Sequence, residues 1–264
     1  MRYIDTHTHL DFAAFAADRS AVVEQSCNSG VSRLVVLGVS QANWAAVWDL
    51  TQTEPSIYAA LGLHPVFLGE HLDEHLTELR EWLGRLAGEP KCCAVGEIGL
   101  DYYVEELDRK RQHYLFETQL AMAADFNLPA LLHVRRAHAP TIALLKHMKL
   151  RRAGIVHAFS GSLEEAREYI RLGFKLGIGG AATWPQAKRM HRVLAQLPIE
   201  SLVLETDSPD MAPAFQPYER NTPGNLPRIC EILAEIRHEQ ADVLARACLH
   251  NSCELFGWDS TAMC

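Results

Sequence analysis

The strongest constraint on the fold is a regular alternation along the chain. Short apolar runs rich in β-branched residues alternate with longer stretches of helical periodicity. The short runs predict eight strands, at residues 3–4, 33–38, 57–62, 92–96, 129–133, 154–157, 174–178 and 202–205. The longer stretches predict helices that include residues 18–30, 71–87, 108–127, 163–172, 226–238 and 241–256.

Eight strands interleaved with helices favour an α/β fold, a (β/α)8 TIM barrel formed by one domain of residues 1–264. The alternative is a doubly wound open sheet, which usually has fewer strands and often a glycine-rich turn after the first one. Here the first strand is followed by Asp5-Thr-His-Thr-His9, so the barrel is favoured. Ser162 before one predicted helix, and Gly30 and Gly173 after two others, are residues typical of helix ends.

The composition narrows the class of protein. A hydrophobic fraction of 48% in 264 residues suffices for a large core, and no apolar run is long enough to predict a membrane span. The formal net charge is −8, and no Lys or Arg run indicates a duplex-binding surface. Bound cations can nevertheless give an acidic enzyme a site for phosphate. Seven cysteines without a C-x-x-C pair, and a first segment without signal-peptide features, predict a cytoplasmic protein with reduced thiols.

Histidines and carboxylates follow the predicted strands. His7 and His9 lie two residues apart, so their side chains share a face, although this pair alone is a weak signal. The other residues of this kind are Glu97 after the fourth strand, His133 and His157 at the ends of the fifth and sixth, and Asp207 after the eighth. Because barrel enzymes build their sites at the carboxyl ends of the strands, the six residues together predict a metal site.

Six ligands predict two divalent cations, since a single zinc takes about three protein ligands plus water. Glu97 is the expected bridge because a carboxylate has two oxygens. His7, His9, Glu97 and Asp207 would hold the first cation, and Glu97, His133 and His157 the second. A mixed nitrogen and oxygen set suits Zn, Mn, Ni or Fe better than Mg, but ligand type alone leaves Zn, Mg and Mn open.

Short motifs accompany these ligands in a fixed order. They are Asp5-Thr-His-Thr-His-Leu-Asp11, Gly62-Leu-His-Pro65, Gly96-Glu-Ile-Gly-Leu-Asp-Tyr-Tyr103, His133-Val-Arg-Arg-Ala137, His157-Ala-Phe-Ser-Gly161, Glu205-Thr-Asp-Ser-Pro209 and Arg220-Asn-Thr-Pro223. In this order, from about Tyr3 to Phe256, the chain resembles the TatD family of metal-dependent deoxyribonucleases, within the wider amidohydrolase-like barrels. The resemblance implies the same metal ligands and hydrolysis of phosphodiester bonds in DNA.

The chain departs from the family pattern at two places near the expected substrate mouth. Asp210-Met211 replaces a frequent Tyr-Leu, and Thr222 replaces a frequent Glu in the Arg-Asn-Glu-Pro motif. Both departures leave the expected metal ligands intact and bear on substrate preference.

Three further residues are candidates for contact with substrate. The resemblance makes His64 a catalytic or phosphate-contacting residue; the alternative is a strand-ending histidine oriented by Pro65. Arg135 has the charge to bind a phosphate oxygen, or it is a solvated arginine beside Arg136. Glu205 shares a face with Asp207 and is a candidate to bind substrate or a rim loop.

For Asp5 and for the tyrosine pair Tyr102 and Tyr103, the sequence leaves a functional role and a structural role open. Asp5 is placed to fix the tautomer of a ligand histidine, or simply to turn the strand. Tyr102 and Tyr103 are candidates to stack on a base or to pack a loop.

The expected activity is hydrolysis of DNA phosphodiester bonds by a water activated by two cations, with Asp207, Glu97 and His64 as catalytic residues. The acidic charge favours a monomeric exonuclease that acts on single-stranded ends. The alternative is a metal-dependent hydrolase of a small amide, lactone or phosphate ester on the same barrel. A non-catalytic nucleic-acid-binding module is disfavoured by the acidic charge and by the six ligands.

Overall fold

The computed structural model describes residues 1–259, so residues 260–264 of the predicted domain, with Cys264, lie outside the described residues. Eight parallel strands form one sheet with the order β1 to β8, as predicted. Their bounds are β1 Tyr3–Thr8, β2 Val31–Leu37, β3 Ile57–Leu61, β4 Cys92–Asp101, β5 Ala130–Arg135, β6 Gly154–Val156, β7 Lys175–Ile178 and β8 Leu202–Leu204.

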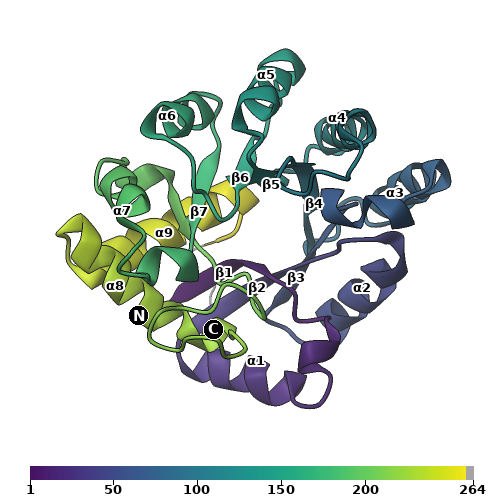
Figure 1. The fold of residues 1–264 in the computed structure, drawn as a ribbon. Helices are drawn as coiled ribbons and strands as arrows, with labels where there is room; N and C mark the ends of the chain where they lie inside the picture. Colours follow the sequence, from purple (N-terminus) through teal and green to yellow (C-terminus); the bar gives the residue numbers. More distant parts are fainter. Residues whose placement is uncertain (260–264) are drawn as a thin grey trace.

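The helices lie around the outside of this sheet (Figure 1). Their bounds are α1 Arg19–Asn28, α2 Trp44–Thr53, α3 Asp73–Arg85, α4 Arg109–Asp125, α5 His138–Met148, α6 Leu163–Arg171, α7 Lys188–Leu194, α8 Leu226–Arg237 and α9 Ala241–Phe256. Short 3-10 turns occupy Ala13–Phe15, Gln41–Asn43, Pro65–Glu70, Gly180–Thr183, Ile199–Ser201 and Pro223–Asn225. No helix in residues 1–259 combines the length and apolarity needed to cross a membrane.

The predicted helix ends are confirmed where the sequence marks them. The hydroxyl of Ser162 accepts a hydrogen bond from the backbone N–H of Glu165 at 3.2 Å, and the Glu165 carboxylate accepts one from Ser162 N at 2.6 Å. Gly30 and Gly173 follow α1 and α6 with φ of 95° and 85°, a region that glycine adopts without strain. The sequence prediction did not specify α2, α5 and α7.

The barrel closes between β1 and β8. Strand β8 ends at Leu204, and the closure is completed by the segment after it, through a parallel bridge between Thr8 and Ser208. The backbone N–H of His9 donates to Ser208 O, and that of Asp207 donates to His7 O, both at 2.8 Å. The closure therefore fixes three of the predicted ligands relative to one another.

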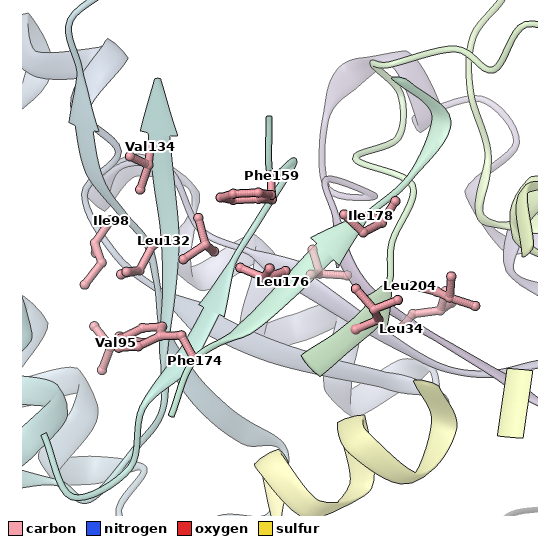
Figure 2. Packing of buried hydrophobic residues seen from close by; sticks show 14 of the residues in the cluster. Leu34, Val95, Ile98, Leu132, Val134, Phe159, Phe174, Leu176, Ile178 and Leu204 are labelled. Carbon is pink, nitrogen blue, oxygen red and sulfur yellow. The ribbon is translucent and has the colours of Figure 1, made fainter. Parts of the chain in front are cut away.

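Two apolar layers lie on the two faces of the barrel wall. The outer layer joins strand residues such as Leu132, Val156 and Leu176 to helix residues such as Phe116 and Tyr169, and part of it is drawn in Figure 2. The second layer joins the alternate strand residues to the end of α9 and Trp258: Val35, Leu37, Ala60, Cys93, Ala94, Leu131, Ile155, Val203, Leu255 and Phe256. Because side chains alternate along a strand, this second layer fills the barrel interior.

The same alternation positions two of the histidines. His133 lies two residues after Leu131, and His157 lies two residues after Ile155, so both point to the interior face beyond the apolar layer. The end of α9 packs on the opposite side of that layer, which leaves the carboxyl ends of the strands for polar residues.

Strand β4 differs from its prediction. It was expected to end at residue 96, but it continues to Asp101, so Glu97 lies within the strand and not after it. Residues Ile98 to Asp101 pair in register with β5, after an irregularity between Val95 and Ile98. In the sequence, a carboxylate flanked by glycines at 96 and 99 indicates the end of a strand. In the structure, β4 extends past these residues because it pairs with β5.

Candidate metal centre

Glu97 stands at the centre of the polar end of the barrel, with a side chain that is only 3% exposed. Its Oε2 lies 3.2 Å from His7 Nε2 and 3.4 Å from His9 Nε2. Asp207 Oδ1 lies 3.5 Å from each of the same two nitrogens. We call this group, namely Glu97 Oε2, His7, His9 and Asp207, the first pole.

The other carboxylate oxygen of Glu97 faces three more imidazoles. Its Oε1 lies 3.1 Å from His64 Nε2, 3.1 Å from His133 Nδ1 and 3.2 Å from His157 Nε2. We call this group the second pole. The structure thus brings all six predicted metal ligands together and places Glu97 between the two sets expected from the sequence, with His64 added to the second.

In three of the imidazoles, an oxygen atom lies close to the ring nitrogen that points away from Glu97, which we call the rear nitrogen. The pairs are His9 Nδ1 with Leu37 O at 3.3 Å, His133 Nε2 with Asp101 Oδ2 at 2.9 Å, and His157 Nδ1 with Glu205 Oε1 at 3.5 Å. An acceptor in that position keeps a proton on the rear nitrogen and leaves the lone pair of the front nitrogen facing the pole. The contact of His157 with Glu205 is an ion pair and not a hydrogen bond, and His7 Nδ1 likewise has no hydrogen-bond partner among residues 1–259.

Asp101 is a residue whose role the sequence did not reveal. The sequence placed it only within the motif Gly96–Tyr103, beyond the predicted end of the fourth strand, yet it is fully buried at the end of β4 and orients His133. Its other oxygen, Oδ1, accepts backbone hydrogen bonds from Tyr103 and Val104 at 2.8 and 3.1 Å. These bonds to histidine and backbone outweigh burial and lower the pKa of Asp101 to about 2. The spacing of four residues from Glu97 along a strand was the available signal.

Glu205 is also a buried orienting residue. Its side chain is 1% exposed, and Oε1 accepts a hydrogen bond from the backbone N–H of Ala158 at 2.5 Å. Gly177 makes room for this carboxylate, because a Cβ there would lie 2.0 Å from Glu205 Oε2. Of the two roles predicted for Glu205, the bond from Ala158 fits contact with a rim loop, since Ala158 follows β6. The other role, contact with substrate, is not supported by a carboxylate that lies behind His157 and is 1% exposed.

Asp5 ties the first strand to the last. Its Oδ1 accepts from the backbone N–H groups of His7 and Thr206 at 3.2 and 3.0 Å, and its Oδ2 accepts from the Thr206 hydroxyl at 2.5 Å. Of the two roles predicted for Asp5, these backbone and threonine partners support the structural one and not the orientation of a histidine side chain. Burial is the largest influence on this carboxyl and raises its pKa to about 7.

The charges at the two poles favour bound cations. Burial alone would lower the pKa of His9, yet hydrogen bonds to Asp207 and Glu97 raise it to about 10. The pKa of His133 and of His157 is raised in the same way, against burial, by the surrounding carboxylates. Burial instead lowers the pKa of His7 and His64. Neutral imidazoles with lone pairs, together with carboxylate oxygens that converge on the poles, fit bound divalent metal.

This electrostatic arrangement sets the pH dependence of cation binding. Because the pKa of His9 is raised, its imidazole holds a proton below about pH 10, and a cation at the first pole must displace that proton. Affinity for Mn²⁺ is therefore expected to rise between pH 6.5 and about 10, by about tenfold per pH unit for each proton displaced. Calorimetric titrations in buffers of different ionisation enthalpy measure the released protons. A pH-independent affinity without proton release would contradict this expectation.

A cavity of about 320 Å³ lies beside the second pole. Its lining residues are His133, Val134, Arg135, His157, Ala158, Ser160, Ala181, Met190, Asp207 and Met211. The exposed guanidinium of Arg135 lies 3.7 Å from the ring centroid of Tyr103, and that of Arg136 lies 4.7 Å from it. The predicted substrate contact Arg135 is thus at the mouth of the metal centre, held by a cation–π contact.

Comparisons with known proteins agree with this centre. The family model described as TatD related DNase matches residues 4–257. An uncharacterized metal-dependent hydrolase, YjjV of Escherichia coli, is 41% identical over 97% of this chain and 98% of its own length. A protein of Pantoea vagans named 3'-5' ssDNA/RNA exonuclease TatD is 33% identical over 96% of this chain and 98% of its own.

Solved structures show the same fold. The crystal structure of YjjV, a TatD homologue from Escherichia coli, has a TM-score of 0.94 and covers 98% of this chain and 99% of its own, at 41% identity. An uncharacterized amidohydrolase from Saccharomyces cerevisiae, at 19% identity, shares the fold with a TM-score of 0.83 over 97% of this chain and 100% of its own. With its metal-binding groups and its barrel, the chain belongs to the TatD related DNase family of metal-dependent hydrolases.

Proposed function

We propose that this hydrolase cleaves phosphodiester bonds of DNA as an exonuclease on single-stranded ends. The observation that carries the proposal is the position of Glu97, whose two oxygens face two separate groups of imidazoles beside an open cavity. Relatives named 3'-5' ssDNA/RNA exonuclease support the substrate class. Degradation of an end-labelled single-stranded oligonucleotide, with divalent metals added to stripped protein, tests it.

The proposed cation ligands follow the two poles. The first set is His7, His9, Glu97 and Asp207, and the second is Glu97, His133 and His157. Two cations bound there would lower the pKa of water and neutralise charge that develops on the phosphoryl oxygens. The buried carboxylates Asp101 and Glu205 would keep His133 and His157 in the tautomer that binds a cation.

Asp207 is the proposed group that orients the attacking water and accepts its proton. Its side chain is 16% exposed, the most exposed of the carboxylates at the poles, and it lines the cavity. Its backbone has φ of 58°, and the hydrogen bond from its N–H to His7 O holds the carboxylate toward both the first pole and the cavity. A proton acceptor in that place has access both to solvent and to bound substrate.

The cavity supports attack at a chain end. At about 320 Å³ it has the size of a site for a small ligand. A net charge of −8 provides little general attraction for a long polynucleotide. One terminal nucleotide in the cavity, with Arg135 placed to bind its phosphate, would satisfy both observations.

Replacing Arg135 with alanine is expected to raise KM for a single-stranded oligonucleotide by about tenfold or more, because a charge-assisted bond to phosphate is lost. Turnover at saturation should change much less, since the side chain of Arg135 is exposed and its cation–π contact is with Tyr103, not with a proposed cation ligand. Steady-state kinetics measure both constants. Arg228→Ala, which removes an exposed arginine paired with Glu231 on α8, is the matched control. Unchanged KM in Arg135→Ala would remove this residue from the substrate site.

A second candidate is hydrolysis of a small phosphate ester, amide or lactone. The small cavity and the Asp210-Met211 departure at its rim favour this alternative, since Met211 lines the cavity. A panel of chromogenic small esters assayed beside the oligonucleotide separates the two. Cleavage of the small esters alone would favour this second candidate.

The proposed location is the cytoplasm, and the proposed assembly is a monomer. The six cysteines within residues 1–259 are free thiols, five of them buried, which supports a reducing environment. Gel filtration of the purified chain tests the assembly.

A further inference from the structure

His64 occupies an ambiguous position at the second pole. Its Nε2 lies as close to Glu97 Oε1 as the nitrogen of His133 does, at 3.1 Å. Ligand atoms of His64, Glu97 and His133 lie within 4.8 Å of one another, which is the arrangement of a metal site. Position alone would therefore make His64 a third imidazole ligand of the second cation. Its other ring nitrogen decides between the two roles.

The rear nitrogen of His64 faces a donor. Its Nδ1 accepts a hydrogen bond from the backbone N–H of Val66 at 3.1 Å. An amide N–H always carries its hydrogen, so Nδ1 must present a lone pair. In a neutral imidazole the hydrogen then belongs to Nε2, the nitrogen that faces Glu97. An Nε2 that carries hydrogen has no lone pair to offer a cation.

Three other histidines at the poles have an acceptor, and not a donor, next to the rear ring nitrogen. Behind His9, His133 and His157 lie oxygen atoms, from Leu37, Asp101 and Glu205. The hydrogen bonds of His9 and His133, and the carboxylate that faces His157, favour hydrogen on the rear nitrogen and leave the front nitrogen free to bind a cation. Among the imidazoles at the two poles of the described structure, His64 is the one with a donor behind it.

The local backbone fixes the donor behind His64 Nδ1. Pro65 has no N–H, so the first available donor of the turn Pro65–Glu70 is Val66, directly behind the ring. The backbone of His64 is held on both sides, by donation of its N–H to Val39 O at 2.9 Å and by His71 Nε2 against its carbonyl at 2.8 Å.

We propose that His64 is a fixed hydrogen-bond donor to Glu97, a positioning residue for the bridging carboxylate, and not a ligand of the second cation. The inference rests on the proposed function, because it concerns the cations expected there. Glu97 Oε1 has two lone pairs, so it can accept from His64 and bind a cation at once. With His64 excluded, the second cation has three protein ligands and keeps positions for water and substrate, as catalytic sites require.

Cation binding to three variants tests this role. His64→Gln places an amide N–H near the position of Nε2, His64→Ala removes the donor, and His133→Ala removes a proposed ligand. We expect both His64 variants to bind two Mn²⁺ per subunit in calorimetry. Affinity should fall by about tenfold in His64→Ala and recover to within about threefold of wild type in His64→Gln. His133→Ala should bind one. Loss of one cation from both His64 variants would overturn the proposal.

Turnover gives an independent readout. His64→Ala should lower kcat by about 10²-fold, with His64→Gln recovering most of it, because a preorganised donor is lost and then replaced. KM should stay nearly constant, since His64 acts through Glu97. A His64→Gln protein as inactive as His64→Ala would contradict the donor role.

The tautomer itself can be observed in the unmodified chain loaded with Zn²⁺. Two-bond ¹H–¹⁵N correlation spectra of ¹⁵N-histidine protein report which ring nitrogen carries hydrogen. We expect hydrogen on Nε2 of His64, and assignment comes from its absence in His64→Gln. Hydrogen on Nδ1, with Nε2 bound to zinc, would overturn the proposal while leaving the proposed function intact. Failure of the wild-type chain to bind any cation would instead defeat the proposed function.

Discussion

Glu97→Ala is expected to lower hydrolysis by on the order of 10⁴-fold, because the several kcal/mol that bound cations contribute to a transition state are lost. Glu97 faces both poles, with Oε2 on His7 and His9 and Oε1 on His133 and His157. No other described carboxylate contacts imidazoles of both poles through separate oxygens. Both cations should therefore leave with it.

The fold should survive this change. Glu97 lies at the polar end of the barrel, while the apolar layers are built from other residues. The imidazoles keep other carboxylate partners, since Asp207 still faces His7 and His9, Asp101 still faces His133, and Glu205 still faces His157. Circular dichroism, metal analysis and kinetics of Glu97→Ala and of Glu97→Gln, beside the surface control Glu231→Ala, measure each part. A Glu97→Ala protein that keeps two cations and a tenth of wild-type activity would contradict the bridging assignment.

Asp207→Asn is expected to lower kcat by about 10³-fold, since a cation ligand and the proposed proton acceptor are lost together. Asparagine is the informative replacement because Asp207 has φ of 58°, a conformation that asparagine tolerates better than alanine. The backbone bond to His7 O should persist, so the barrel closure stays intact.

Cation analysis separates Asp207 from Glu97. In Asp207→Asn the second pole keeps Glu97, His133 and His157, so one tightly bound cation should remain. Asp242→Asn, which changes an exposed aspartate paired with Arg246, serves as control for the loss of one negative charge. Full activity of Asp207→Asn would contradict its role as ligand and proton acceptor.

The sequence was sufficient for the barrel and for the six residues at its polar end. Parallel strands give apolar runs, and a side chain just past the end of such a run lies at the same rim as its counterparts on other strands. His133 and His157 follow interior residues by two positions, a relationship already present in the sequence. These are local patterns, so they needed no knowledge of long-range contacts.

The orienting contacts were not predictable in the same way. Asp5 contacts Thr206, which lies 201 residues later in the chain. No pattern in the sequence indicates the contact between Glu205 and Ala158. Asp101 fell outside the predicted strand 92–96 because the length of β4 depends on its pairing with β5. Which nitrogen of each histidine faces its pole depends on such contacts, so ligand and donor roles emerge only in three dimensions.

The most direct test of the account is degradation of an end-labelled single-stranded DNA oligomer by metal-stripped protein, with Mg²⁺, Mn²⁺ or Zn²⁺ added back and Glu97→Ala as control. We expect a ladder of shortened products that requires a divalent metal and that Glu97→Ala does not make, with the labelled end giving the polarity of digestion. Intact oligomer under every metal, from wild-type protein shown to hold two cations, would contradict it.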